Sequence, residues 1–579
     1  IIIVTITLLF VPAIQNQIAK IAAKYVSKQI NVDFSLNNFS FTDFNTICIE
    51  NLYFSDLDKD TLIYAENLKV IIEDIDIENL TFTLDRVIAD NLKMNHIKHL
   101  EHDYSNLIEI FPRKKKTKKS EKTFKLYCNY FDGENLNYKY KDYAVEETPL
   151  NINFKDVDVS NTNVKAMNIA IIGSRITLKI LDISLHEKTG FNVLVEHGDF
   201  TLDRELLSVQ NFIAKTPTSD FDIDVTFDAP FNKYKYFTDS VFINAEIKEN
   251  SIINIIDIAY FTSSLAGANN TITAKAKVNG PVNDMYVSNA LFNIGKNTII
   301  DTDIHLVDTD SPNIFLDVDI YHLQTSAADI ESIMIPAFKP NVCKPYSIKL
   351  PKQVDELGMI KTKGSFEGKI TDFNTKFLLH TDNGDVDLDV LFHPIDNNIN
   401  EFNIALNGNE LNIGKILNIA DKVSTLDANF SLTGTTKKFK PKTYKVKGEI
   451  DNINLKHLTL NNLDIEVNNS GDDFYANMNI VNENIALEFF LNLFKYDNVY
   501  NSNISIRSQQ TNLSKLGLMD YDKDFKASFL LSSDIVGNDI ETLSTNTYIS
   551  DLILSDANHT TTPVSIALKA FGVYPAFSA

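Results

Sequence analysis

The stretch Phe221-Asp-Ile223-Asp-Val225-Thr-Phe227 decides the fold class, because apolar and polar residues alternate along it without a break. A period of two places every second side chain on one face of a β-strand. The same alternation recurs far away, for example at Val386-Asp-Leu388-Asp-Val390. We therefore expect a mainly β protein: one very long, curled antiparallel sheet that forms an elongated apolar groove, with an N-terminal membrane helix and a few short helices.

The composition limits the function classes. The 579 residues carry 54 basic and 77 acidic side chains, a formal net charge of −23, whereas nucleic-acid binding needs a basic surface. Acidic residues such as Asp222 and Asp387 occupy the polar phase of the alternation and indicate a solvated outer face. Cys48, Cys128 and Cys343 have no spacing typical of a disulfide framework or a metal site. We expect no nucleic-acid partner.

The chain begins with an uncharged apolar run over residues 1–11. A membrane span needs about 20 such residues, so we expect a truncated transmembrane anchor over 1–13, with a signal-peptide core as the alternative. Next, Ile14, Ile18 and Ile21 recur at helical spacing, with Lys20 and Lys24 on another face, which predicts an amphipathic helix over 14–30. This helix either caps the end of the sheet or lies on a bilayer surface.

The remainder divides by its strand patterns. The expected parts are a first groove segment over 31–112 with a helix near 95–111, a basic loop over 113–122, groove strands over 123–325, a helix and irregular connection over 326–357, and a groove continuation over 358–579. At roughly 12 residues per strand and turn, this predicts on the order of 45 strands.

Two clusters of polar residues could carry chemistry. His96, His99 and His102 lie three residues apart within the helix expected near 95–111. Steps of three place them only loosely on one helical face, and no carboxylate or cysteine stands at a recognised spacing, so we expect no metal site. The basic run from Arg113 to Ser120 indicates a surface loop, with contact to an anionic lipid surface as the alternative.

No catalytic constellation is present in the sequence. The nucleotide-binding, hydrolase, zinc-protease and calcium-loop motifs are absent. The stretch Asp382-Asn-Gly-Asp385-Val-Asp387 lacks the sixth-position Gly and terminal Glu of a calcium loop, so it predicts a hairpin turn. We expect no enzyme, no catalytic or metal residue and no cofactor.

The apolar phase is the candidate functional feature. A long sheet with few helices can curl so that this face lines an interior, which hydrocarbon tails can fill at about 0.8 kcal/mol for each buried CH₂. Substituting Ile223 or Val225 by Asp should then block transport, whereas Asp224→Lys should not. The candidate lipid-groove residues are Phe39, Phe41, Val70, Ile72, Phe154, Phe221, Ile223, Val225, Phe227, Val386, Leu388, Val390, Ile450, Leu463 and Ile465.

Several stretches resemble the TamB family, which is AsmA-like, in its Bacteroidota form. They are Pro12 to Gln15, a helix ending Tyr25-Val-Ser27, Asn51 to Val70, Leu207 to Ser219, Gly358 to Gly368, Thr381 to Gly384, Leu411 to Leu417 and Leu432-Thr-Gly434. These motifs touch most of the chain and are structural rather than catalytic. The family's conserved C-terminal domain is not recognisable in Thr561–Ala579, so we expect a chain that is truncated before it.

The resemblance implies a single-pass inner-membrane anchor with the bulk of the chain in the periplasm. It implies transport of phospholipid toward the outer membrane, with phospholipid acyl chains, the inner membrane and an outer-membrane barrel assembly protein as partners. The alternative is a translocation and assembly factor that holds outer-membrane or autotransporter polypeptides by β-augmentation. A repetitive surface adhesin is disfavoured, because no short regular repeat is present.

Overall fold

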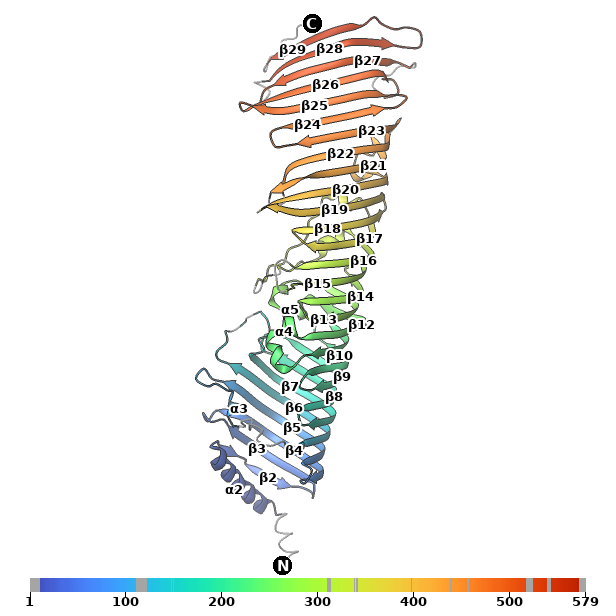
Figure 1. Cartoon of the computed structure of the whole chain (residues 1–579). Helices are drawn as coiled ribbons and strands as arrows, with labels where there is room; N and C mark the ends of the chain where they lie inside the picture. Colours follow the sequence, from blue (N-terminus) through green and yellow to red (C-terminus); the bar gives the residue numbers. More distant parts are fainter. Residues whose placement is uncertain are drawn as a thin grey trace, which may run out of the picture. The chain divides into compact units, whose positions relative to one another are not determined.

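We describe the chain from a computed structural model, which covers residues 11–110, 122–309 and 314–571 except 147, 149, 338, 340–341, 397, 438–439, 456–457, 517–523 and 539–542. The protein is mainly β, as predicted, and its 29 described strands belong to one sheet (Figure 1). Two compact units divide the chain. The first comprises Ile1–Lys296, His305–Pro312 and Ser332–Ile348, and the second comprises Asn297–Ile304, Asn313–Glu331 and Lys349–Ala579.

The first unit contains the strands β1 to β14 and the helices up to η2. In chain order these elements are α2 (Pro12–Ile30), β1 (Phe34–Ser35), β2 (Asn38–Phe41), β3 (Thr46–Ser55), β4 (Thr61–Asp76), β5 (Thr81–Lys98), α3 (Asn106–Ile110), β6 (Lys125–Asp142), β7 (Asp156–Ile172), β8 (Arg175–Glu187), β9 (Asn192–Leu202), β10 (Leu206–Lys215), β11 (Asp220–Asp228), η1 (Phe231–Tyr236), α4 (Phe237–Ser240), β12 (Phe242–Asn254), α5 (Ile255–Ala259), η2 (Ser263–Leu265), β13 (Thr271–Gly280) and β14 (Asp284–Ile294).

Strand β15 has residues in both units, and the strands that follow it belong to the second. In chain order the elements are β15 (Thr298–Val307), β16 (Phe315–Ser326), α6 (Ala327–Ser332), α7 (Lys352–Asp355), β17 (Met359–Lys369), β18 (Asp372–Thr381), β19 (Gly384–Asp396), β20 (Ile399–Leu411), α8 (Ile413–Ile416), β21 (Val423–Lys437), β22 (Lys440–Leu455), β23 (Leu458–Asn469), β24 (Phe474–Val481), β25 (Ala486–Tyr496), β26 (Val499–Asn512), β27 (Lys526–Val536), β28 (Ser544–Ser555) and β29 (Val564–Phe571).

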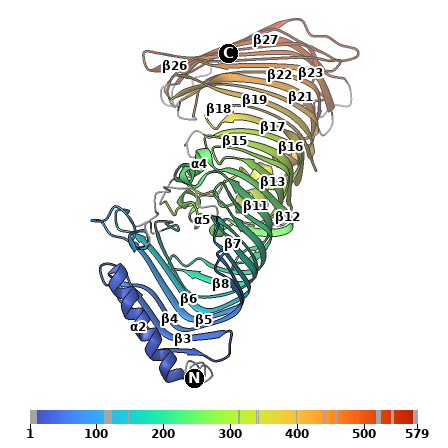
Figure 2. The same cartoon turned by 60° about the horizontal axis from the view of Figure 1, so that its bottom comes forward.

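The strands are longer and fewer than the sequence analysis predicts. The described residues form 29 strands rather than about 45, because β5 and β6 run for 18 residues each and several others exceed the usual five or six. Within the first unit these long strands bend, as Figure 2 shows for β3 to β8.

Among the described strand pairings within the two units, all but one are antiparallel, so the expectation of an antiparallel sheet is wrong at this point. β5 pairs in parallel with β6, with Val87 opposite Phe131. A parallel neighbour requires the chain to cross back to the start of β5, which takes a connection of a dozen or more residues. This connection joins Lys98 to Lys125, and α3 lies in its described part.

The helix expected over 14–30 is confirmed as α2, which begins with Pro12 at its first position and ends at Ile30, where Asn31 caps it in the left-handed conformation (φ 56°). Figure 1 draws α2 beside β2, and Figure 2 draws it beside β3. Among the described residues, no helix combines the length and the hydropathy that a membrane span requires. Most of the anchor expected over 1–13, and of the basic loop expected over 113–122, lies outside the described residues.

Other helix expectations are partly confirmed. The helix expected near 95–111 is confined to α3, because β5 continues to Lys98. The helix expected at the start of 326–357 is α6, and the connection after it carries the single turn α7. The strand pattern over 123–325 is interrupted by η1, α4, α5 and η2, which the alternation did not predict. The hairpin turn at Asp382-Asn383 is confirmed between β18 and β19.

Many asparagines lie inside strands rather than in turns. Asn51, Asn91, Asn135 and Asn211 have φ near +50° within β3, β5, β6 and β10. Asn tolerates this left-handed conformation better than most residues. At Asn211 the pairing of β10 with β11 shifts between Val209 and Phe212, which defines a β-bulge. Bulges increase strand bending and twist, so these asparagines help the long strands to curve.

Candidate functional site

One face of the second unit is a continuous line of apolar residues. Each strand from β16 to β29 contributes one residue that pairs directly with the next. This line, the central row, consists of Ile320, Gly364, Phe377, Leu388, Leu406, Phe430, Gly448, Ile465, Met478, Phe489, Ile506, Leu531, Ile549 and Ile566. Directly paired residues lie on the same face of a sheet. The apolar phase therefore stays in register across all of these strands.

The opposite face of the sheet carries polar residues, each one position away in the chain from a residue of the central row. Asp387, Asn407, Asn429, Glu449 and Asp464 pair in succession from β19 to β23, and all five are exposed. The sheet of the second unit thus has one apolar and one hydrated face along these strands.

Ion pairs cross the hydrated face. Lys376 Nζ lies 3.0 Å from Asp389 Oδ2, and Lys445 Nζ lies 2.6 Å from Glu466 Oε1. The hydrogen bond from Lys445 lowers the pKa of the Glu466 carboxyl. A depression of about 730 Å³ over β16 to β21 is lined by the residues of the central row on these strands and by the residues beside them in the chain. The central-row residues in its lining are Ile320, Gly364, Phe377, Leu388, Leu406 and Phe430.

The predicted groove residues of the second unit fall on its apolar face. Leu388 and Ile465 belong to the central row, and Val386 and Val390 flank Leu388 on the same side of β19. Ile450 pairs with Leu463. These last two are 6% and 7% exposed and pack in a core cluster with Leu426 and Ile480, so side chains of the protein itself already surround them.

The first unit carries a comparable line of apolar residues. It runs from β2 to β11 through Phe39, Ile49, Leu68, Ala89, Gly133, Val164, Ile183, Val195, Ala214 and Phe221. The parallel pair β5–β6 does not interrupt this line, because Ala89 lies opposite Gly133.

The other predicted residues of the first unit lie on strands beside this line. Phe41 pairs with Ile47, which pairs with Val70. Ile72 pairs with Leu84.

On β11, every predicted groove residue has an apolar partner on β10. Ile223 pairs with Phe212, Val225 with Val209, and Phe227 with Leu207.

Phe154 is the exception, and its expected place on a groove strand is wrong. Phe154 lies in a turn before β7 and is 69% exposed. The Asn153 side chain accepts the N–H of Lys155 at 3.0 Å, and the N–H of Asp156 returns to the Asn153 carbonyl. These short-range hydrogen bonds favour a turn over an extended strand.

A second apolar feature was not predicted from the sequence. A pocket of about 650 Å³ lies between α2 and the first strands. It is lined by Gln15, Ile18, Ala19, Ala22, Ala23, Val26, Phe34, Leu36, Phe39, Phe41, Phe44, Ile49 and Leu52. Helical spacing revealed that α2 is amphipathic but not that its alanines leave space above the strands. We call this space the α2 pocket.

The three histidines do not share a helix. His96 lies on β5, where Nε2 is 2.7 Å from Ser105 Oγ and burial lowers its pKa. His99 and His102 lie in the turn after β5, with Nε2 atoms 3.9 and 3.8 Å from Asp58 Oδ2. Glu109 accepts a hydrogen bond from His102 at 2.8 Å.

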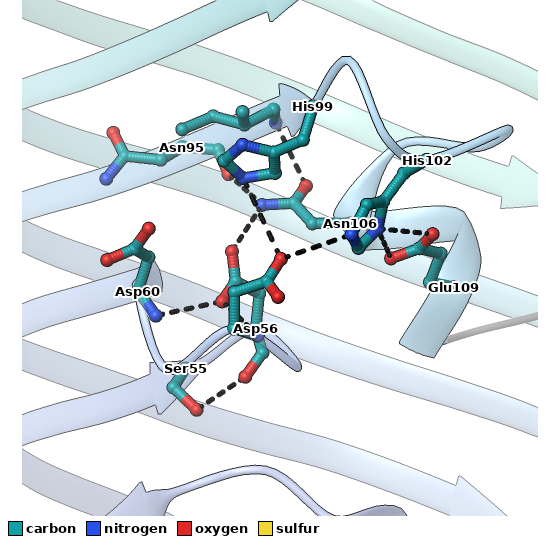
Figure 3. Close-up of polar contacts among 10 residues, drawn as sticks. Ser55, Asp56, Asp60, Asn95, His99, His102, Asn106 and Glu109 are labelled. Carbon is teal, nitrogen blue, oxygen red and sulfur yellow. Dashed lines mark hydrogen bonds and ion pairs between the residues drawn. The ribbon is translucent and has the colours of Figure 1, made fainter.

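A fully buried carboxylate beside these histidines anchors the crossover (Figure 3). Asp56 Oδ1 accepts the N–H groups of Asp58 and Asp60 at 3.0 and 2.8 Å, and Oδ2 accepts Asn106 Nδ2 at 3.1 Å. Asp56, Asp60 and His99 each offer one potential metal ligand within 4.8 Å of the others. Because Asp56 accepts hydrogen bonds from both the β3–β4 turn and Asn106 of α3, this cluster links the two elements.

Comparisons with protein-family models, with curated proteins and with solved structures found no match to this chain.

Proposed function

We propose that the apolar face of each unit serves as a groove for phospholipid acyl chains, and that the protein supports phospholipid transport toward an outer membrane. The observation that carries the proposal is the central row, which keeps one apolar residue on every strand from β16 to β29. Acyl chains can occupy such a surface at any position, because apolar burial is non-directional. A continuous row therefore suits a ligand that moves along it.

The two-faced sheet gives further support. The exposed polar row beginning at Asp387 keeps the opposite face hydrated, and no described helix is long enough to cover the row from Phe377 to Ile566. A protein core would need such a cover, whereas a lipid groove needs its apolar face to remain accessible. Under this proposal, phosphate head groups extend into water while the tails contact the row.

The features of α2 fit a place beside a membrane. Ile21 and Tyr25 are each 66% exposed, and Lys20, Lys24 and Lys28 share the helix with no acidic residue. Apolar and basic side chains on one helix favour the surface of an anionic bilayer. The proposed setting is the periplasmic side of an inner membrane, within a protein of the TamB type.

Site-specific photocrosslinking tests the proposal. A photoreactive residue at Leu406 should capture phospholipid in the full chain purified from its membrane source, whereas the same group at the adjacent Asn407 should not. Mass spectrometry identifies the captured molecule. Capture of polypeptide at Leu406 would favour the assembly-factor alternative, and equal lipid capture at both positions would overturn the groove proposal.

A further inference from the structure

We propose that the α2 pocket binds a single fatty acyl chain whose head carries a carbonyl or carboxylate oxygen, and that Gln15 Nε2 donates a hydrogen bond to this oxygen. The inference deepens the proposed function and rests on it only for the presence of lipid. It assigns a fixed binding position at the start of the first unit, whereas the apolar rows would serve a moving ligand.

Gln15 is the polar exception in the pocket lining. Its side chain is 4% exposed, and Oε1 accepts the N–H of Phe41 at 2.8 Å. This bond fixes the orientation of the side-chain amide. If Oε1 and Nε2 were exchanged, the Nε2 donor would face the Phe41 N–H, which is also a donor. Nε2 must therefore point away from the Phe41 N–H, and among the described residues it has no hydrogen-bond partner.

A buried N–H donor without an acceptor is costly, at about 1–3 kcal/mol. The lining offers no second polar side chain, because every other lining residue is apolar. An occupant that is apolar along most of its length and carries one acceptor oxygen satisfies both conditions. A fatty acid, or the ester-linked chain of a phospholipid, has this chemistry.

The size and the access of the pocket agree with such a ligand. Its volume of about 650 Å³ lies within the range of roughly 300–1,000 Å³ typical of small-molecule sites. Ala19, Ala22 and Ala23 line the pocket where larger side chains would fill the space. Ile18 and Phe44, which are 50% and 89% exposed, also line the pocket, so it reaches the surface beside them.

The first arm of the test changes the donor alone. Gln15→Glu keeps an oxygen that can accept the Phe41 N–H but replaces Nε2 by a second oxygen. Binding of palmitate to the full chain should weaken by about tenfold or more, because a hydrogen bond to a charged group is lost. Binding of hexadecanol should not weaken, because its hydroxyl can donate to the introduced carboxylate. Equal effects on both probes, or no effect on either, would overturn the assignment.

The second arm fills the pocket. Ala19→Phe should abolish binding of one palmitate equivalent, whereas Ala13→Phe, at an exposed position of the same helix, should not. Circular dichroism and the thermal midpoint show whether each variant is folded. If Ala19→Phe folds normally and still binds the same amount, the pocket is not the binding position.

Two further readouts separate this inference from the proposed function. Lipid extracted from the purified wild-type chain shows whether the natural occupant is a free fatty acid or a phospholipid, and either supports the shared chemistry. If Ala19→Phe has no effect while photocrosslinking at Leu406 still captures phospholipid, only the α2 pocket assignment fails. A wild-type chain that takes up no palmitate overturns it directly.

Discussion

The carboxylate Oδ1 of Asp224 accepts the backbone N–H of Asn211 at 2.5 Å, and so holds the β10 bulge from the neighbouring strand. The same arrangement recurs in the second unit, where Asp427 Oδ1 accepts the N–H of Glu410 at 2.6 Å. Both donors have positive φ. An acidic residue on the adjacent strand thus satisfies the N–H that each bulge removes from the ladder.

Asp224→Ala should destabilise the β10–β11 pair by about 0.5–1.5 kcal/mol, because the exposed Asn211 N–H exchanges its carboxylate acceptor for water. That Asp224→Lys does not block transport stays a prediction, but we expect this substitution to destabilise the β10–β11 pair as well. Lys248 also lies 3.1 Å from Asp224, so the lysine substitution would add repulsion. Hydrogen exchange of β10 and β11 measures the effect. Asp224→Asn, which keeps an acceptor oxygen, should retain most of the protection; equal loss in both variants would contradict this account.

Leu388→Asp should lower the phospholipid that copurifies with the chain, because it places a charge in the central row. Asp387→Lys, one residue away on the hydrated face, should leave lipid retention unchanged. Quantitative lipid extraction checks both variants, and thermal unfolding reports whether each is folded. Loss of lipid in both variants alike would mean that the phase of the strand does not determine binding.

Gly448→Val should destabilise the second unit by about 1–3 kcal/mol, because of overpacking. A Cβ atom at Gly448 would lie 2.5 Å from the Phe430 ring, its neighbour in the central row. The double variant with Phe430→Ala should recover part of this loss, because the two changes share one contact. Thermal midpoints of the wild type, the two single variants and the double variant complete a double-mutant cycle. If the two destabilisations simply add, the Phe430 ring is not what the new side chain collides with.

Protection of α3 should depend on pH through His102. The hydrogen bond to Glu109, more than the nearby charges of Glu109 and Asp58, raises the pKa of His102 above 6.5, although burial opposes the shift. A raised pKa means that the folded state favours the proton, so the stabilisation is complete below pH 6.5 and is lost as the pH rises through the folded-state value. Hydrogen exchange of α3, corrected for intrinsic rates, should be slower at pH 6 than at pH 8.5.

His102→Gln removes the titrating group and should flatten this pH dependence. His96 serves as the comparison, because burial lowers its pKa and its contribution has the opposite sign. An unchanged pH dependence in His102→Gln would assign the effect to another residue.

Tyr25→Trp should report membrane contact of α2, because the sequence contains no other Trp. On addition of anionic vesicles, the fluorescence should shift to shorter wavelength, and brominated lipid should quench it. Tyr496→Trp, at an exposed position of β25 (69%), provides the control. Equal quenching of both reporters, or none at Tyr25→Trp, would count against membrane contact by this helix.

The sequence predicted the two faces of the sheet well, because burial of one strand face leaves a period of two. Leu388 and Ile465 were found by alternation alone, and the register then placed them in one row. Neighbouring strands with the same pattern, such as Phe402-Asn-Ile404-Ala-Leu406, carry the same signal. Periodicity fixes which residues share a face but not which strands are neighbours.

Features that depend on single residues were missed. A mid-strand Asn such as Asn211 resembles a turn residue in the sequence, because left-handed backbone serves both turns and bulges. The parallel pairing of β5 with β6 is set by the crossover after Lys98, for which local alternation carries no signal. The α2 pocket depends on how closely small residues such as Ala23 approach the strands, which is a tertiary property.

The bulges also bear on how such a chain can vary in length. At Asn211 one extra residue is accommodated in the left-handed conformation, and Phe212 returns to an apolar partner in Ile223. A single inserted residue can therefore be absorbed inside a strand without exchanging its faces, provided that the insertion tolerates positive φ. The next strand then keeps its apolar residues on the same face of the sheet. The sheet can therefore gain or lose single residues while its apolar rows persist.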